Sequence, residues 1–332
     1  MRVLFVHVTP TLASARVRVL QLIPHLEAEG VACRAVTHPT SPGALRAVLR
    51  GADADVVVLQ KKLPSLLGGL AWRAARAPLV FDYDDAVFSR QRSRGGVHES
   101  PTRRRRFDRA CRLADAFSCG NDHLASFCRP LAKPVLVAPS PVPLDVPRAD
   151  AGRFRDPVRI GWIGSSVNLH ELDVIAPALR EISRTRRVVL VVISDEAVSV
   201  DGVVVENVPW SLDSQADRVA DLDIGIMPLA DSPWSRGKCS YKLLQYMAAG
   251  LPAVASPVGM NVEVVEDGRS GLFATETRGW VGALERLMDD PALAGAVGRE
   301  GRKVVESRFG YPEQARRWKE FLVGVSGVRV DG

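Results

Sequence analysis

The stretch Lys238-Cys-Ser-Tyr-Lys-Leu-Leu-Gln-Tyr-Met-Ala-Ala-Gly-Leu-Pro-Ala-Val-Ala-Ser-Pro-Val-Gly259 carries the most information about the fold. Its apolar residues recur at helical spacing, and Gly250 followed by Pro252 predicts the end of a helix that begins at Lys238. The next residues, 253–255, predict a short buried strand. Lys238 and Lys242 are four positions apart, so in a helix their ammonium groups lie on one face beside the free N–H groups of the first turn. This arrangement suits a phosphate or diphosphate.

A purely structural interpretation of the same stretch is also open. A Leu-Leu-x-x-Met stripe at helical spacing is usually part of a core, and lysines at a helix start usually lie in solvent. A helix, a Gly-Pro stop and a short strand also occur in many parallel α/β proteins. The stretch alone therefore leaves both anion binding and a plain αβ repeat open.

Short apolar runs alternate with helical patterns along the whole chain. Such alternation predicts parallel sheets whose two faces are covered by helices. In the first half, we expect strands at 3–8, 31–37, 55–60, 79–82, 116–119 and 135–138 and helices at 15–29, 42–51, 63–75, 101–114 and 122–130. In the second half, we expect strands at 158–163, 188–194, 203–207, 224–227 and 253–255 and helices at 169–184, 213–221, 238–249, 278–287, 292–305 and 311–323.

A proline-rich segment, 140–147, separates the two halves and predicts an extended linker. At 332 residues the chain is long enough for two domains of about 150 residues each. The predicted fold class is α/β, with two Rossmann-like domains facing each other across a cleft. We expect an N-terminal domain at 1–150, a C-terminal domain at 151–310 and a final amphipathic helix within 311–332.

The composition, with 46% hydrophobic residues, is that of an ordinary globular protein. The apolar run at 1–8 is too short for a signal sequence, and no run approaches the ~20 residues of a membrane span. The five cysteines form no C-x-x-C pair, which favours reduced packing residues over a metal or disulfide framework. We therefore expect a cytoplasmic protein.

The positive charge of the chain is concentrated in its first half. Residues 1–150 hold 22 Lys and Arg against 13 Asp and Glu, whereas residues 151–332 hold 22 against 25. Much of the excess comes from a cluster of arginines: Arg90, Arg92, Arg94, Arg103, Arg104, Arg105, Arg106, Arg109 and Arg112. The cluster could attract an anionic partner or hold the protein at the inner face of an acidic membrane, and a solvated face is an equally open interpretation. It lacks regularly interleaved aromatic residues, so nucleic-acid binding is disfavoured.

Four further segments accompany 238–259 in the second half of the chain, and together they span more than 100 residues. They are 159–166 (RIGWIGSS), 205–211 (VENVPWS), 220–228 (ADLDIGIMP) and 261–272 (NVEVVEDGRSGL). With 238–259 they resemble the donor domain of retaining glycosyltransferases of the GT-B architecture, the family 4 type or group 1 glycosyltransferases. The resemblance implies transfer of a sugar, with retention, from a nucleoside-diphosphate donor such as a UDP- or GDP-sugar. It implies no metal or other cofactor, an acceptor bound by the N-terminal domain, and a last helix that crosses back to that domain.

The donor site predicted from these segments lies in the second half of the chain. We expect Lys238 and Lys242 to be catalytic, because cations beside the leaving diphosphate stabilise the charge that develops there. The glycine loop adds amide and hydroxyl donors from Gly164, Ser165 and Ser166. The resemblance adds Val208, in the segment that reads the nucleotide base, and Asn261. Gln245 lies on the helix of the two lysines and could bind ribose hydroxyls, although a plain surface glutamine is equally open.

The chain departs from the family pattern at four positions. Gly237 and Gln245 stand where the family typically has two glutamates, and Ser165 and His170 stand where it usually has Arg and Lys. We expect the two lysines of the opening stretch to supply the missing positive charge, with His170 as a weaker candidate. The alternative is a decayed site that binds a sugar nucleotide without catalysis.

In the first half, the segment 81–88 (FDYDDAVF) places three carboxylates directly after a predicted strand, at the sheet edge where α/β proteins bind ligands. Asp82 and Asp84 have a D-x-D spacing that could hold Mg²⁺ or Mn²⁺, but the resemblance argues against a metal. It implies that Asp84 or Asp85 orients an acceptor hydroxyl or contacts the donor sugar. Capping of a turn by aspartate is the structural alternative.

The loop after the first strand and the start of the next helix carry Ser14, Arg16 and Arg18, which we expect on the acceptor side of the cleft. The arginines could bind an anionic or membrane-presented acceptor, or lie at an exposed helix start. Lys61, after the third strand, has the same two interpretations. A nicotinamide-dependent enzyme is disfavoured, because no G-x-G-x-x-G follows the first strand.

Overall fold

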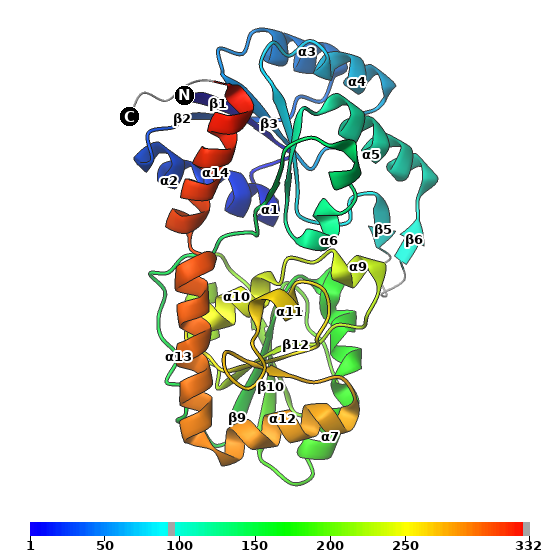
Figure 1. Ribbon diagram of the computed structural model, residues 1–332. Helices are drawn as coiled ribbons and strands as arrows, with labels where there is room; N and C mark the ends of the chain where they lie inside the picture. The colour runs from blue at the N-terminus through cyan, green and yellow to red at the C-terminus, as the bar shows by residue number, and fades with distance from the viewer. Residues whose placement is uncertain (92–96, 328–332) are drawn as a thin grey trace.

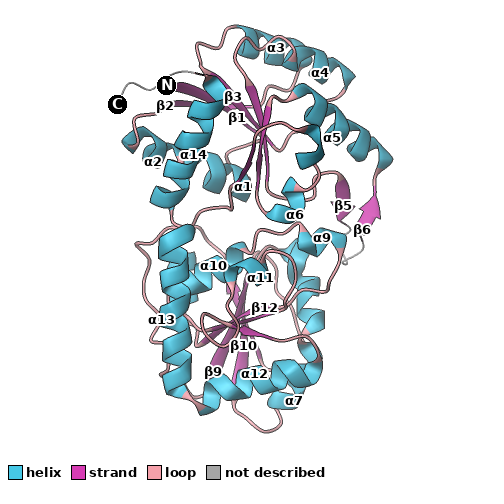
Figure 2. Cartoon of the chain, in the orientation of Figure 1, coloured by secondary structure: helices cyan, strands magenta, loops and turns pink. Residues whose placement is uncertain are grey.

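The computed structural model describes residues 1–91 and 97–327. Within these residues the chain forms two six-stranded sheets, one in each half, in which neighbouring strands run parallel. Helices cover both faces of each sheet (Figure 2). This architecture confirms the predicted α/β class with two Rossmann-like domains.

The N-terminal sheet has the strand order β2-β1-β3-β4-β7-β8. Its strands are β1 (Arg2–His7), β2 (Ala32–Thr37), β3 (Val56–Gln60), β4 (Leu79–Tyr83), β7 (Ala116–Cys119) and β8 (Val135–Val137). The helices are α1 (Ala13–Ala15), a π-helix η1 (Arg16–Leu20), α2 (Ile23–Ala28), α3 (Pro42–Arg50), α4 (Leu66–Trp72), α5 (Pro101–Leu113), α6 (Asp122–Ala125) and a 3₁₀ turn η2 (Arg129–Leu131). A hairpin of β5 (Ser89–Gln91) and β6 (Val97–Glu99) lies outside the sheet. The central strands β3 and β4 are buried at every residue, as expected for strands covered on both faces.

The C-terminal sheet has the order β11-β10-β9-β12-β13-β14. Its strands are β9 (Val158–Ile163), β10 (Val188–Ser194), β11 (Val205–Pro209), β12 (Ile224–Met227), β13 (Ala253–Ala255) and β14 (Leu272–Phe273). The helices are a 3₁₀ helix η3 (Ser166–Val174), α7 (Ala176–Ile182), α8 (Gln215–Ala220), α9 (Pro233–Arg236), α10 (Tyr241–Ala248), α11 (Asn261–Val264), α12 (Thr277–Asp289), α13 (Pro291–Arg308) and α14 (Tyr311–Ser326).

Each sheet has one point where the strand order reverses. In the N-terminal sheet the chain moves outward from β1 to β2 and then returns to place β3 on the other side of β1. In the C-terminal sheet β9 has the same central position, between β10 and β12. Ligands of open parallel sheets bind outside the carboxyl ends of the strands at such points. The loops after β1, β3, β9 and β12 are therefore the places to search for a site.

Three predicted helices differ from the structure for local reasons, and a fourth, expected at 122–130, is divided into α6 and the 3₁₀ turn η2. The helix expected at 15–29 is divided into α1, η1 and α2, with Pro24 in the first turn of α2. The helix expected at 169–184 is the 3₁₀ helix η3 followed by α7, which carries Pro177 in its first turn. The helix expected from Lys238 begins only at Tyr241, because Ser240 has a left-handed backbone with φ 52°. The short elements β5, β6, β14, α9 and α11 were not predicted.

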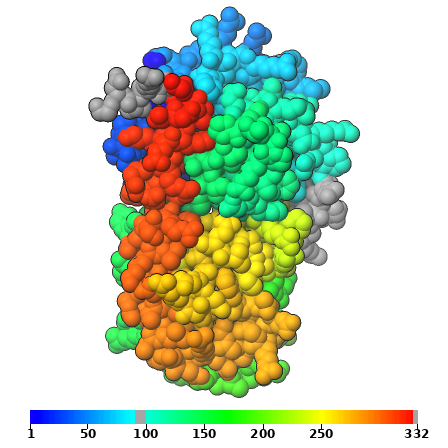
Figure 3. All heavy atoms as spheres, in the orientation of Figure 1, coloured from blue at the N-terminus to red at the C-terminus, as the bar shows by residue number. Residues whose placement is uncertain are grey.

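The last helix, α14, packs on the N-terminal domain although it follows the C-terminal sheet in the chain. Figures 1 and 3 show it on the surface of that domain, with α13 continuing over the other domain. Trp318 is buried against Phe5 of β1, with ring centroids 6.2 Å apart. Tyr311 stacks on His25 at 5.0 Å and donates a hydrogen bond to Gln21. No helix among the described residues is long and apolar enough to cross a membrane.

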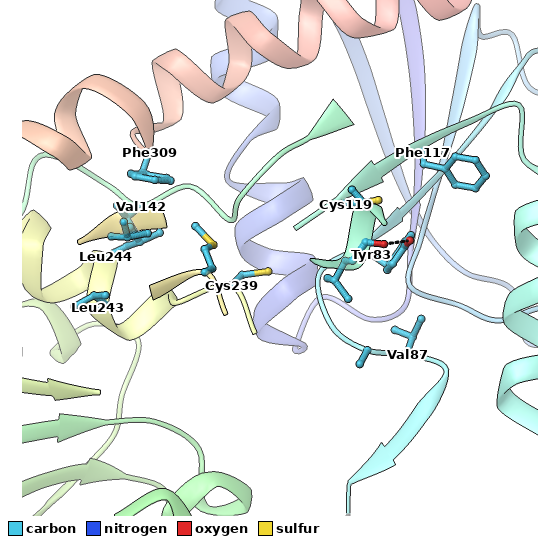
Figure 4. Close-up of a cluster of buried hydrophobic side chains, with 14 of the residues drawn as sticks. Tyr83, Val87, Phe117, Cys119, Val142, Cys239, Leu243, Leu244 and Phe309 are labelled. Atoms are coloured by element: carbon cyan, nitrogen blue, oxygen red, sulfur yellow. Dashed lines mark hydrogen bonds between the residues drawn. The ribbon is translucent and has the colours of Figure 1, made fainter. Parts of the chain in front are cut away.

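One hydrophobic cluster is shared by the two domains (Figure 4). It contains Tyr83 and Cys119 from the N-terminal sheet and Leu244 from α10. Val142, from the proline-rich segment, and Phe309, between α13 and α14, join the same cluster. Because apolar contact is continuous between them, the two domains are held in a defined relation.

We expect Trp318→Ala to lower the free energy of unfolding by about 3–5 kcal/mol, because the change leaves a large cavity between α14 and β1. Chemical denaturation followed by circular dichroism measures the loss. Lys319→Ala, which changes a more exposed neighbour on the same helix, serves as the control and should stay within about 0.5 kcal/mol of wild type. A Trp318→Ala protein as stable as this control would show that α14 contributes little to the N-terminal domain.

Candidate active site

The first part of the site is the loop after β9. A Cβ on Gly164 would lie 2.6 Å from the ring of Trp162, so only glycine fits there without a shift. Ser165 is exposed. Ser166 donates its N–H and its hydroxyl to Asp195, at 2.6 and 2.8 Å, and these bonds lower the pKa of Asp195. Two of the predicted loop donors, the N–H and the hydroxyl of Ser166, are therefore already bound to a carboxylate of this chain.

The second part is a buried cluster in which one carboxylate binds two ammonium groups. Glu171, on η3, forms salt bridges with Lys238 and with Lys242, whose Nζ lies 2.6 Å from Glu171 Oε2. Lys238 also donates to Asn168 at 3.0 Å, and the Lys242 ammonium lies 4.2 Å from the centre of the Trp162 ring. All three charged side chains are largely shielded from water. The cluster has two positive charges and one negative charge, so one positive charge is left for an anion.

Burial and pairing act in opposite directions on these groups. Burial alone would raise the pKa of Glu171, but Lys242 and Lys238 together hold it below its ordinary value. Burial lowers the pKa of Lys242, Lys238 adds to the lowering, and Glu171 opposes it. Glu171 therefore helps to keep Lys242 charged in a dry environment.

The two predicted catalytic lysines lie together, but not as two turns of one helix. Lys238 precedes α10, and the left-handed Ser240 separates it from the helix start. The Ser240 hydroxyl donates to Asn261 Oδ1 at 2.7 Å, and Asn261 Nδ2 donates to the carbonyl of Ser256. Asn261 is buried, so its side chain supports the lysine loop and does not face a ligand.

Gln245 lies on α10 at the edge of an interdomain cavity of about 240 Å³. Its Nε2 donates to Gln215 at 3.2 Å, and Trp210 donates to the same oxygen at 3.3 Å. The cavity is also lined by Arg16, whose guanidinium lies 5.6 Å from the centre of the Trp210 ring. Val208 lies nearby in sequence on the edge strand β11 and is half-buried.

On the N-terminal side, Arg18 does not face the cleft as predicted. It is buried and forms two hydrogen bonds with Asp82, at 2.5 and 3.1 Å. The carbonyl of Ala138 and the hydroxyl of Ser118 accept its remaining N–H groups. A buried carboxylate needs a cationic partner, and the guanidinium of Arg18 and the carboxylate of Asp82 are bound to each other. Arg18 is therefore a structural residue, and Asp82 is not free for a D-x-D metal site.

The other two carboxylates converge on Lys61. Its Nζ lies 3.0 Å from Asp84 and forms a second salt bridge with Asp85, and it also donates to Ser14 at 3.4 Å. Burial would raise the pKa of Asp84, but Lys61 and Arg18 hold it low. The pKa of Asp85 is raised by burial and by Asp84, against the pull of Lys61. The two neighbouring carboxylates thus differ in acidity, which suits different roles in catalysis.

Within the described residues, no three His, Cys, Asp or Glu side chains are grouped as metal ligands. His170, the weaker candidate for supplying the missing positive charge, is half-buried, and its Nδ1 contacts the carbonyl of Val167 at 3.0 Å. Arg92 and Arg94 of the predicted arginine cluster lie outside the described residues, and Arg90 lies in β5.

The two halves of the site meet along a tight interdomain contact. Asn121, which caps α6, donates to the carbonyls of Arg236 and Lys238 at 3.1 and 2.9 Å. Cys239 Sγ contacts the carbonyl of Asp84 at 3.0 Å, and a Cβ on Gly120 would overlap this sulfur. Asp84, Asp85, Lys238 and Lys242 are therefore brought to one interface, and the charge of Lys238 acts on Asp85.

Gly237 is part of the same contact. A Cβ at this position would lie 3.2 Å from Ala86 of the N-terminal domain. Any larger side chain would need these neighbours to shift by a few tenths of an ångström. Glycine at this position thus fits the close contact between the domains.

Sequence reasoning missed three residues of the site. Glu171 binds both lysines but lies 67 and 71 positions before them. Trp162 forms the wall beside Lys242, and Asn121 joins the domains. A single acid, an apolar strand residue and a helix cap carry no distinctive local pattern. Only the position of Glu171, soon after the glycine loop, could have drawn attention to it.

Comparisons with known proteins agree with this fold. Residues 157–290 match the family model described as "Glycosyl transferases group 1". A D-inositol 3-phosphate glycosyltransferase from Arthrobacter sp. (strain FB24) is 31% identical over 105 residues, which is 31% of this chain and 24% of that protein. The aligned segment thus spans about a quarter of that relative's length.

Solved structures match over nearly the whole chain. Sucrose-phosphate synthase from Thermosynechococcus elongatus has a TM-score of 0.74 at 15% identity, covering 98% of this chain and 99% of that one. Anabaena HepE in complex with UDP and glucose has a TM-score of 0.73 at 14% identity, covering 97% and 99%. At these identities the likeness establishes the fold, which is GT-B.

The buried charge cluster predicts a pH-dependent stability. Because the folded pKa of Glu171 lies below 4.5, its stabilisation is present above that pH and is lost as the pH falls through the folded pKa. We expect Glu171→Gln to lower the free energy of unfolding by about 3–5 kcal/mol at neutral pH. The gap between wild type and variant should shrink as the pH falls below about 4.5. Denaturation curves between neutral and acid pH measure this gap.

The exposed Glu196→Gln is the matched control and should show no such gap. A difference between wild type and Glu171→Gln that is small at neutral pH, or constant with pH, would contradict the assignment of Glu171 as the buried partner of both lysines.

Proposed function

Because residues 157–290 form a group 1 glycosyltransferase domain within a GT-B fold, we propose that this protein transfers a glycosyl group from a nucleoside-diphosphate sugar to an acceptor. The observation that supports this most directly is the cluster of Lys238 and Lys242 around Glu171 at the reversal point of the C-terminal sheet. Its excess positive charge, in a largely dry site, suits the diphosphate of a donor.

The donor is a UDP- or GDP-sugar, and no metal ion or other cofactor is required. HepE, which shares the fold, is described in complex with UDP and with UDP-glucose. In this chain the two ammonium groups replace a divalent cation beside the diphosphate. The interdomain cavity beside Gln245, with Trp210 nearby, offers room and hydrogen-bonding groups for the nucleoside.

Transfer proceeds with retention of the anomeric configuration. The anomeric C–O bond breaks, its electron pair passes to the diphosphate oxygen, and the lysines stabilise that charge. The acceptor oxygen bonds to the anomeric carbon on the same face, and its proton passes to the departing phosphate. Glu171 is held by both lysines and is a poor nucleophile, which favours this front-face course over a covalent intermediate.

The acceptor binds the N-terminal domain near Lys61. Asp85, whose carboxylate has a raised pKa, accepts a hydrogen bond from the acceptor hydroxyl, and the ionised Asp84 holds Lys61 in place. Ser14 and Arg16 line the same side. The positive charge of the first 150 residues favours an anionic or membrane-presented acceptor.

A second candidate is a protein that binds the sugar nucleotide without turnover. Two observations favour it: glycine at 237, and a glutamine at 245 that bonds to Gln215. Release of the nucleoside diphosphate from its sugar donor, assayed with and without candidate acceptors, separates the two. A transferase releases it, whereas a binding protein holds the donor unchanged.

Titration calorimetry with UDP, GDP, ADP and TDP tests the donor site. We expect one nucleotide to bind equally with and without Mg²⁺. Lys242→Ala should weaken that binding about 10- to 100-fold, because a charge-assisted hydrogen bond to phosphate contributes about 1.5–3 kcal/mol. Lys303→Ala, an exposed lysine on α13, is the control and should bind as wild type does. Binding that needs Mg²⁺, or that survives Lys242→Ala, would refute the proposed site.

A further inference from the structure

Helix α4 buries Trp72 but exposes all three of its leucines. Leu66, Leu67 and Leu70 are 72%, 64% and 59% exposed. The buried side of the helix instead carries Gly68 and Gly69, among others. A Cβ on Gly69 would lie 2.9 Å from the side chain of a residue on α5, so the helix is pressed close to its neighbour. Three adjacent exposed leucines form a surface that water does not favour.

The two helices that pack against α4 are rich in arginine. Helices α3, α4 and α5 pack side by side (Figure 1). Their sequences together hold eight arginines and one acidic residue, Asp108, which is paired with Arg104. Arg105, Arg106 and Arg112 are exposed and form no salt bridge with any residue that the structure describes. The surface therefore combines apolar side chains with uncompensated positive charge.

We propose that α4 and α5 form a docking surface for a lipid bilayer that contains anionic phospholipids. Leu66, Leu67 and Leu70 enter the boundary between headgroups and acyl chains, and the arginines of α5 bind the lipid phosphates. Guanidinium groups form paired hydrogen bonds with phosphate oxygens, and their aliphatic stems lie against apolar surface. A soluble anion would explain the arginines but not the leucines, and an apolar protein groove would explain the leucines but not the arginines.

The leucine surface is close in sequence to Lys61 on the acceptor side of the candidate site. Lys61, which binds Asp84 and Asp85, precedes Leu66 by five positions, so their Cα atoms are at most about 18 Å apart. A bilayer on α4 could thus present an acceptor to the site. That role rests on the proposed function, whereas the docking itself does not require any reaction, so the two can fail separately.

Sedimentation with vesicles tests the docking. The probes are vesicles of phosphatidylcholine alone and of phosphatidylcholine with about 30% phosphatidylglycerol, at low salt and at about 0.5 M NaCl. We expect the full chain to bind only the anionic vesicles and to be released in part by salt. The triple variant Leu66→Ser, Leu67→Ser, Leu70→Ser should bind at least tenfold more weakly, as should Arg105→Gln, Arg106→Gln, Arg112→Gln.

The matched control is Leu131→Ser with Val262→Ser, two exposed apolar residues outside α4, and it should bind as wild type does. Thermal unfolding of every variant checks that these surface changes leave the fold intact. Binding to both vesicle types alike, no binding by wild type, or full binding by the leucine variant would overturn the proposal. A dimer of wild type that the leucine variant converts to monomer, measured by light scattering, would overturn it in favour of a contact between two copies.

Discussion

Two ammonium groups stay charged inside a folded domain only if a carboxylate lies close to both, and Glu171 meets this requirement for Lys238 and Lys242. Helix η3, the loop before α10 and Trp162 all contribute side chains to this cluster. Taken alone, the cluster has one more positive than negative charge, so under the proposed function a diphosphate would meet cations that are already in place. Preorganised charge of this kind is the largest catalytic contribution in many group-transfer enzymes. Within this cluster two lysines share one carboxylate, and the charge of Lys238 also acts on Asp85 of the other domain.

The N-terminal domain divides its charges differently. Arg18 and Asp82 neutralise each other in the core and hold the ends of β4, β7 and β8 together. Lys61 binds Asp84 and Asp85 beside the contact between the two domains. Asp82 lies within β4, whereas Asp84 and Asp85 follow the end of that strand, so carboxylates close in sequence have different partners.

The site exists only where the two domains meet. Gly120 and Gly237 let the backbones approach closely, and Asn121 ties the lysine loop to the N-terminal domain. The shared hydrophobic cluster and helix α14, which packs on β1, also hold the two domains together. The leucine surface of α4 lies outside these contacts, so a partner could bind there without disturbing the contact between the two domains.

The sequence by itself determined the two αβ repeats, the class of fold and the location of most site segments. Strands such as β9, β10, β12 and β13 were predicted residue for residue, because apolar periodicity and Gly-Pro stops are local properties. Only the tertiary structure decided that Arg18 is buried, that Asn261 supports a loop, and that Glu171 joins the two lysines. Each of these depends on a partner many positions away or on one left-handed residue, Ser240. Local patterns record how a segment folds, whereas the pairing of buried charges depends on which segments the fold brings together.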